Sequence, residues 1–96
     1  MKIEVITPEK KVFKGEAEAV QFPGIGGSFQ VLNNHAPIIS ALSSGKIKID
    51  LKDAEQAVKP IEGVIENDPT NKNVIYIAIK GGVMEMKNNV ISVLAS

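Results

Sequence analysis

The sequence contains no cysteine and no arginine, and each absence excludes a class of protein. Without cysteine, the 96-residue chain has no disulfide framework and is compatible with a reducing compartment. All eleven basic residues are lysines, and eleven acidic residues balance them to a formal net charge of zero. Nucleic-acid binding and polybasic membrane anchoring both depend on an excess of positive charge. We therefore predict no nucleic-acid partner and no direct membrane insertion.

Long apolar runs are also missing. The longest, Val74–Ile79, is far too short to span a bilayer. Residues 1–11 lack the apolar segment that a secretory signal contains. The length of the chain is about that of one small domain. We expect a single soluble domain over residues 1–96.

The apolar residues that are present favour strands. Isoleucine occurs 13 times and valine 10 times, against four leucines. Branching at Cβ disfavours helices and suits a pleated sheet. Alternation with a period of two predicts shared strand faces for Ile3 with Val5, for Val20 with Phe22, and for Ile47, Ile49 and Leu51. The nearly continuous apolar runs 74–80 and 90–95 predict strands that are buried on both faces.

Turn-forming residues separate these runs. They predict turns at residues 7–10, 23–27, 33–34, 43–45 and 88–89. Short strands at this spacing are typical of an all-β, antiparallel β-sandwich, here of about ten short strands. Residues 52–73 alternate poorly and predict a long excursion between core strands. Within it, residues 53–58 are compatible with a helical turn and residues 66–73 with a loop tip.

No enzyme motif is complete. The glycines at positions 24 and 26 begin a dinucleotide-binding pattern, but Phe29 stands where the third glycine belongs. The Ser-Gly-Lys at 44–46 lacks the following Ser or Thr of a phosphate-binding loop. Glu16 and Glu18 share a strand face, which is more typical of a solvated surface than of paired catalytic carboxylates. One histidine and no cysteine do not make a zinc site. We predict no catalytic residues, no metal and no cofactor.

His35 is the only histidine, at a junction between a turn and a strand. Three roles are open to it. It can donate to a backbone carbonyl and fix the turn, contact a partner, or act as a base. The third role would make the chain a small hydrolase that uses His35.

Three stretches together resemble one known family. They are IEVITPEKKVFKGEAEAVQFPG, GSFQVLNNHAPIISALSSGKIKI and IKGGVMEMKNNVISVLA. In this order they are similar to the N-terminal β-sandwich domain of the epsilon subunit of rotary ATP synthases, called delta in mitochondria. The most specific elements are His-Ala-Pro at 35–37 and Gly-Gly-x-x-Glu at 81–85. The sequence departs from the family pattern where Asn33-Asn34 replaces Pro-Gly, where Gln30 replaces Gly, and where Ser28 often has an acidic counterpart.

The resemblance implies a non-catalytic rotor subunit at the cytoplasmic face of the bacterial plasma membrane. It implies docking to the gamma subunit and to the polar loops of the membrane rotor ring, which couples proton flow to ATP synthesis. The C-terminal helical hairpin of full-length relatives is not expected in a sequence that stops at Ser96. By family position, the candidate contact residues are Gly24, Ile25, Gly26, Gly27, Ser28, Asn33, Asn34 and His35, whereas Ile38–Leu42 is expected to be core. The alternative is a free-standing β-sandwich that binds a peptide or a small ligand.

Overall fold

The computed structural model describes residues 1–53, 61 and 63–96, and within them the chain folds into nine strands. The predicted all-β fold is confirmed, with nine strands where about ten were expected. No helix among the described residues has the length and apolar character needed to cross a membrane. The strands are β1 Lys2–Ile6, β2 Lys11–Gly24, β3 Gly27–Leu32, β4 Ile38–Leu42, β5 Gly45–Leu51, β6 Ile65–Asn67, β7 Val74–Ile79, β8 Gly82–Lys87 and β9 Val90–Ala95.

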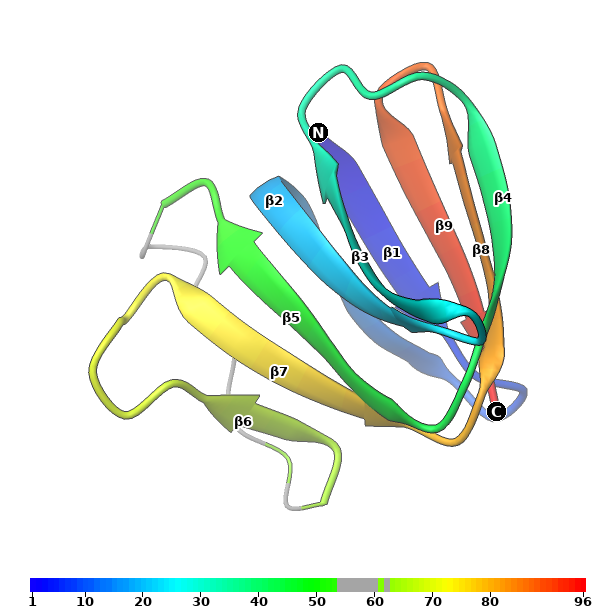
Figure 1. Cartoon of the computed structure of the whole chain (residues 1–96). Coiled ribbons are helices and arrows are strands. Elements are labelled where there is room, and N and C mark those ends of the chain that lie inside the picture. Colours follow the sequence, from blue (N-terminus) through cyan, green and yellow to red (C-terminus); the bar gives the residue numbers. More distant parts are fainter. Residues whose placement is uncertain (54–60, 62) are drawn as a thin grey trace.

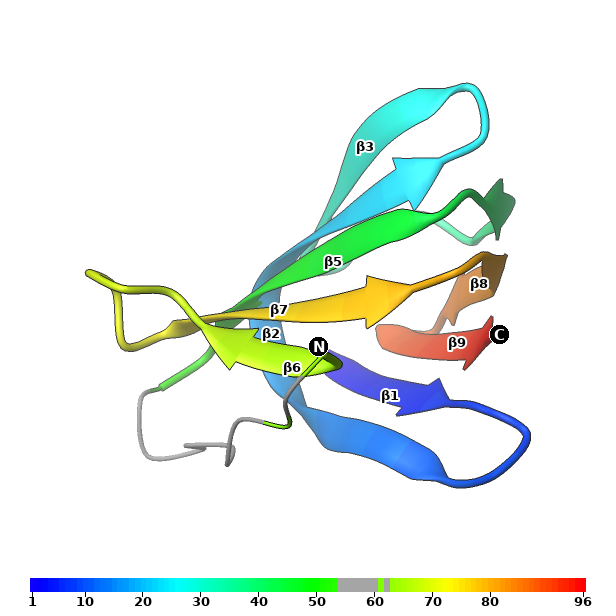
Figure 2. The same ribbon diagram turned by 90° about the horizontal axis from the view of Figure 1, so that it is seen from below.

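The long strand β2 joins the two layers of the sandwich (Figure 1). Its first half pairs with β1, and its second half pairs with β3 and β5. One layer runs β1-β9-β8-β4, and the other runs β3-β2-β5-β7-β6. Figure 2 shows the second layer from below as a twisted fan, with β3 and β6 at its two edges. Among the described residues, the strands pair antiparallel except for β1 and β9, which run parallel.

A bulge in β2 makes this double role possible. The pairing of β2 with β5 shifts register between Ala17 and Ala19. Before the shift, Phe13 and Ala17 are buried, and after it Val20 and Phe22 are buried. One extra residue reverses which side chains face inward and also bends the strand. The same strand can therefore present its buried side to one layer and then to the other.

The core lies between the layers and is apolar, with mostly aliphatic side chains. None of the buried side chains in the described chain is polar. The faces predicted from alternation are confirmed, because all seven of their residues are at most 2% exposed. Phe22 stacks on the half-buried Phe29 with ring centroids 5.5 Å apart. Each fully buried side chain of this size contributes roughly 1.5–3 kcal/mol.

The prediction that the continuous apolar runs are buried on both faces is wrong. In β9, Leu94 is 63% exposed and Val90 is also exposed. In β7, Ala78 is exposed. The expectation of core for Ile38–Leu42 is wrong in part, since Leu42 is buried but Ile39 is 70% exposed. The reason is that each layer of a two-layer sandwich has only one covered face.

The predicted excursion contains a strand that alternation did not reveal. Ile65–Asn67 forms β6 and pairs with β7. The predicted helical turn at 53–58 falls, apart from Asp53, outside the described residues. The loop tip is confirmed at residues 68–73.

A carboxylate organises that loop tip. One oxygen of Asp68 accepts from the N–H groups of Thr70 and Asn71, at 3.1 and 3.0 Å. The other accepts from the hydroxyl of Tyr76, at 2.8 Å. The Tyr76 hydroxyl, followed by the two backbone N–H groups, lowers the pKa of Asp68. The folded state thus favours the ionised carboxylate.

We predict that Tyr76→Phe lowers stability in a pH-dependent way. Because the pKa of Asp68 is lower in the folded state, its contribution is present above the unfolded pKa of about 4 and is lost as pH falls through the folded value. The deficit of the variant should therefore be seen at pH 7 and shrink in strongly acidic buffer. Urea titrations from pH 2.5 to 7 measure it. In an Asp68→Asn background the effect of Tyr76→Phe should no longer vary with pH; a variation that persists there would contradict the prediction.

Gly82 is required at the start of β8. Its φ is +149°, and a Cβ placed on it would lie 2.3 Å from the Leu94 carbonyl oxygen in the paired strand. That separation is far below contact distance, and backbone atoms in a ladder cannot move away without breaking it. Glycine is thus the residue that lets β8 and β9 begin their pairing here.

We predict that Gly82→Ala lowers the free energy of unfolding by about 3 kcal/mol, through overpacking and backbone strain. Gly26→Ala is the matched control, because a Cβ at that position would have nothing within 4 Å and its φ is not in the left-handed region. Chemical denaturation of both variants measures the difference. Equal stabilities would show that the β8–β9 contact relaxes at little cost.

Candidate functional site

The predicted contact residues fall into two groups at opposite ends of β3 (Figure 1). Residues 24–28 surround the hairpin tip between β2 and β3. Residues 33–35 begin the loop that leads from β3 to β4. Six residues of extended strand span about 20 Å. The two groups therefore form two separate sites rather than one patch.

The hairpin tip is uncharged and is held against β4. The backbone N–H of Ile25 donates to the Ala41 carbonyl at 3.3 Å, and the N–H of Ser43 donates to the Pro23 carbonyl at 2.7 Å. The Ile25 side chain is 70% exposed. Next to it, the Gln21 amide donates to the Ser28 hydroxyl at 2.8 Å. The tip thus offers one aliphatic side chain and a hydroxyl on a fixed backbone.

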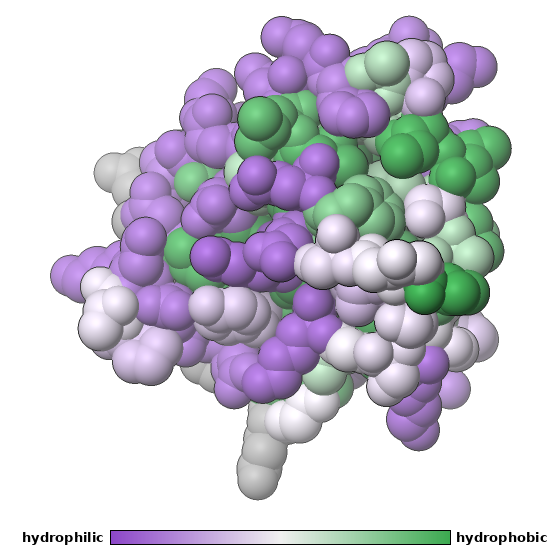
Figure 3. All heavy atoms as spheres, in the orientation of Figure 1, coloured by the Kyte–Doolittle hydropathy of each residue, from purple (hydrophilic) through white to green (hydrophobic). Residues whose placement is uncertain are grey.

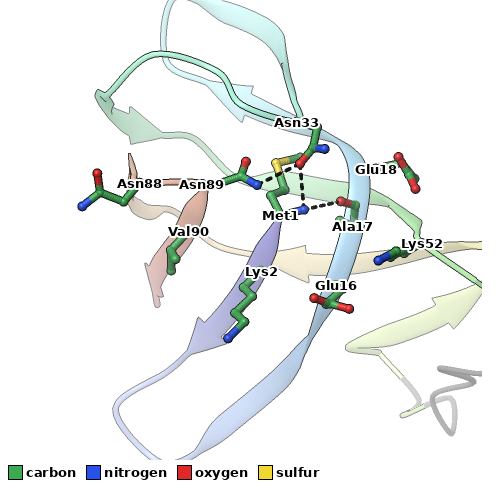
Figure 4. A pocket seen from close by; sticks show the side chains of 10 residues that line it. All are labelled: Met1, Lys2, Glu16, Ala17, Glu18, Asn33, Lys52, Asn88, Asn89 and Val90. Carbon is green, nitrogen blue, oxygen red and sulfur yellow. Dashed lines mark hydrogen bonds between the residues drawn. The ribbon is translucent and has the colours of Figure 1, made fainter.

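Three asparagines tie together the loops at the other end, and we call Asn33, Asn34 and Asn89 the asparagine clasp. Figure 4 shows two of them, Asn33 and Asn89. The Asn89 side chain donates to Asn33 Oδ1 at 3.0 Å and accepts from the Asn34 N–H at 2.8 Å. Asn33 Oδ1 also accepts from the Met1 ammonium at 2.9 Å. That ammonium donates in addition to the Ala17 carbonyl at 3.0 Å. The clasp thus connects the β3–β4 loop, the β8–β9 turn and the start of β1.

The predicted asparagine turns are confirmed in their backbone. Asn34 has a φ of 64°, and the two residues of the β8–β9 turn, Asn88 and Asn89, have φ values of 53° and 61°. Asparagine tolerates this left-handed region better than other non-glycine residues. Asn34 can therefore replace the glycine of the family pattern.

A recess of about 440 Å³ opens beside the clasp (Figure 4). Its rim carries charges of both signs, from Lys2, Lys52, Glu16 and Glu18. Both glutamates are exposed, in agreement with their predicted solvated face. In its wall, Asn33 and Asn89 bind one another and Asn33 binds the ammonium, so the recess marks a joint between chain segments. Within the described residues, no three His, Asp or Glu side chains are grouped to hold a metal ion.

His35 is exposed, and its ring Nδ1 lies 2.7 Å from the Ala36 carbonyl oxygen. A carbonyl oxygen only accepts, so Nδ1 carries the hydrogen. The backbone N–H of His35 donates to the Leu32 carbonyl at 3.1 Å. Both contacts are those expected if His35 fixes the turn. No serine in the described chain donates to the ring. Its exposure also leaves the ring available for contact with a partner.

A third surface escaped the prediction from sequence. It is a row of aliphatic side chains on the outer face of the β1-β9-β8-β4 layer, which we call the aliphatic row. Strand register places its members side by side: Ile6 opposite Leu94, Leu94 opposite Val83, and Val83 opposite Ala41. Leu94 is 63% exposed and Val83 is 46% exposed. Two residues along β4, on the same face as Ala41, lies the exposed Ile39.

The outer face of the other layer is different. There, register aligns Gln21, Lys48, Tyr76 and Glu66 across four strands. In Figure 3, hydrophobic side chains gather along the right margin, on the side where Figure 1 places β4 and β8, and the left side is largely hydrophilic. An antiparallel sheet with a solvated outer face normally alternates apolar and polar residues. The second layer follows that rule, and the first layer breaks it along the aliphatic row.

Comparisons with known proteins agree on one family. The family model described as ATP synthase, Delta/Epsilon chain, beta-sandwich domain matches residues 1–68. The ATP synthase epsilon chain of Chlorobium limicola is 38% identical over 74 residues, which cover 77% of this chain and 84% of that protein. The epsilon chain of Salinibacter ruber is 33% identical over 93 residues, 97% of this chain. This chain spans only 56% of the length of that second relative.

A solved structure shares the fold. A chain in the cryo-EM structure of the Tetrahymena thermophila mitochondrial ATP synthase, central stalk and c-ring, aligns with a TM-score of 0.69. The alignment covers 99% of this chain and 62% of that chain, at 18% identity. The likeness thus concerns the arrangement of strands.

We predict that Asn89→Gly lowers the free energy of unfolding by about 1 kcal/mol, because the amide that bridges the two loops is lost together with its two hydrogen bonds. Asn88→Gly is a matched control. Both positions have positive φ, so glycine suits both backbones, and the Asn88 side chain makes no hydrogen bond within the described chain. Urea denaturation compares the two variants. If both were as stable as the parent chain, the clasp would carry no net stability.

Proposed function

Because the chain belongs to the delta/epsilon-chain family of ATP synthase β-sandwich domains, we propose that it binds the gamma subunit and the membrane rotor ring. Members of this family are non-catalytic subunits of the central stalk. In this role the chain would couple proton flow through the ring to ATP synthesis at the catalytic subunits. It would lie on the cytoplasmic face of a bacterial plasma membrane as a peripheral part of the complex.

The observation that carries the proposal is the aliphatic row. Four adjacent strands each place an aliphatic side chain at a paired position on the outer face of their layer, and the exposed Ile39 lies beside them. Contiguous exposed apolar surface of this kind marks interaction sites in soluble proteins. We assign the row to the gamma subunit, since burying it against a large protein partner removes apolar area from water at roughly 25 cal/mol per Å².

The hairpin tip is our candidate for the ring. The resemblance makes both loops, residues 24–28 and 33–35, candidates for contact with the ring or the gamma subunit. We choose the tip for the ring because the exposed Ile25 and Ser28 are side chains that can reach a polar loop. Relatives often have an acidic residue at the position of Ser28, so this contact would use the Ser28 hydroxyl in place of a carboxylate. Residues 33–35 lie at the other end of β3, and we assign them to the gamma subunit. Contacts at two ends suit a subunit placed between two partners.

The sandwich is built to transmit force between such contacts. Its core is closely packed aliphatic material, and packed interiors have low compressibility. The strand β2 runs through both layers, so a load on the hairpin tip reaches the β1 side through covalent bonds and through the ladders on each side. A coupling subunit needs this stiffness.

We predict that Ala41→Lys weakens binding to the cognate gamma subunit at least tenfold, because an ammonium group is placed in the aliphatic row and must be desolvated. Ala78→Lys is the matched control. It makes the same change at an exposed alanine in a strand, on the hydrophilic outer face of the other layer. Surface plasmon resonance with purified gamma subunit measures both, after circular dichroism confirms the fold. Equal affinities would place the gamma contact elsewhere, and no binding by the parent chain at tens of micromolar would refute the proposed function.

A further inference from the structure

We propose that the free edge of β3 receives an extended, uncharged segment of the gamma subunit as an additional antiparallel strand. This inference rests on the proposed docking to the gamma subunit and adds how the partner is held. Backbone hydrogen bonds along the edge supply affinity in this mode of recognition, and side chains at alternate positions supply specificity.

One edge of β3 is open. In the described part of the chain β3 pairs with β2 alone. The cross-strand pairs alternate between hydrogen-bonded and non-hydrogen-bonded types. Pro23 has no N–H, and its carbonyl accepts from the N–H and hydroxyl of Ser43, at 2.7 and 3.1 Å. The pair of Pro23 with Ser28 is therefore the non-hydrogen-bonded type, in which backbone groups point away from the partner strand.

Alternation then fixes the rest of the edge. The pair of Gln21 with Gln30 is of the same type as the pair of Pro23 with Ser28. The N–H and C=O groups of Ser28 and Gln30 thus point outward from β2. The Leu32 carbonyl, two residues further along, accepts from the His35 N–H at 3.1 Å, which confirms the direction. A run of backbone donors and acceptors with strand spacing is available to a partner.

This open edge of β3 also lacks the usual protection against pairing with another chain. Proteins block open edges with short strands, charged residues or proline. The edge strand β6 follows that pattern, because it has three residues and Glu66 forms an ion pair with Lys46. The edge strand β3 has six residues with no charge and no proline. Residues 19–45 contain no Asp, Glu, Lys or Arg at all, although charged residues make up 23% of the chain.

The absence of charge along this edge limits which segment can occupy it. An edge free of charge cannot compensate a charge on an incoming strand, so the segment that fits is uncharged. The edge is also continuous with the proposed gamma contact. Its far end leads directly into residues 33–35, which we assign to the gamma subunit. One partner that contacts residues 33–35 can therefore continue along β3.

The test removes one outward N–H. Gln30→Pro deletes the donor at the free edge and leaves the hydrogen bonds between β2 and β3 in place, because proline is tolerated where the N–H faces solvent. Gln30→Ala is the matched control, since it removes the side chain and keeps the N–H. We expect Gln30→Pro to weaken binding of the purified cognate gamma subunit about tenfold or more, and Gln30→Ala to change it less than about threefold.

Hydrogen exchange of the unmutated chain gives a second readout that does not depend on the folding of a variant. The Ser28 and Gln30 amides should exchange rapidly in the free chain and become protected when the gamma subunit is added. If the gamma subunit binds without protecting them, strand addition is wrong and the proposed function stands. If it does not bind, both fail. If the free chain is already a dimer with these amides protected, a second copy occupies the edge, and the assignment to the gamma subunit is overturned.

Discussion

The bulge in β2 is the constraint on which the rest of the structure depends. A regular strand of 14 residues would keep one set of side chains on one side along its whole length. The register shift between Ala17 and Ala19 moves the buried set from odd to even positions. Because of that change, Phe13 can cover the β1 side of the core while Phe22 covers the β5 side. Both layers and the hairpin tip at the end of β2 take their positions from this one irregularity.

The two-layer arrangement also decides which surfaces are left for partners. Each layer has one inner face and one outer face, and the inner faces take up the aliphatic core. The β5 layer has a polar outer face that water can solvate. The β9 layer carries the aliphatic row on its outer face, which water solvates poorly. The sequence therefore encodes more apolar strand surface than a single copy of the chain can bury by itself.

The sequence predicted which strand faces are apolar, but it could not predict what covers each of them. Strand faces such as Ile47 with Ile49, and the turns at 33–34 and 88–89, follow from local alternation and from residues that tolerate positive φ, so they were predictable. The run at 90–95 was interpreted as buried on both faces, because a strand pattern shows that a face is apolar and cannot show what covers it. The bulge and β6 were missed because the one shifts alternation by a single residue and the other is only three residues long. The clasp was missed because the Asn89 side chain binds a backbone N–H 55 positions away and a side chain 56 positions away.

The distance between the two groups of predicted contact residues could not be predicted from local sequence patterns either. Residues 24–28 and 33–35 are near one another in the sequence, which suggested one contact surface, yet β3 separates them along its full length. A strand is the element that most effectively turns a short sequence separation into a long spatial one, at about 3.3 Å per residue. A subunit that lies between two partners gains from that geometry. The partners can be engaged at opposite ends of a single stiff hairpin, whose root in β2 is fixed by both layers of the core.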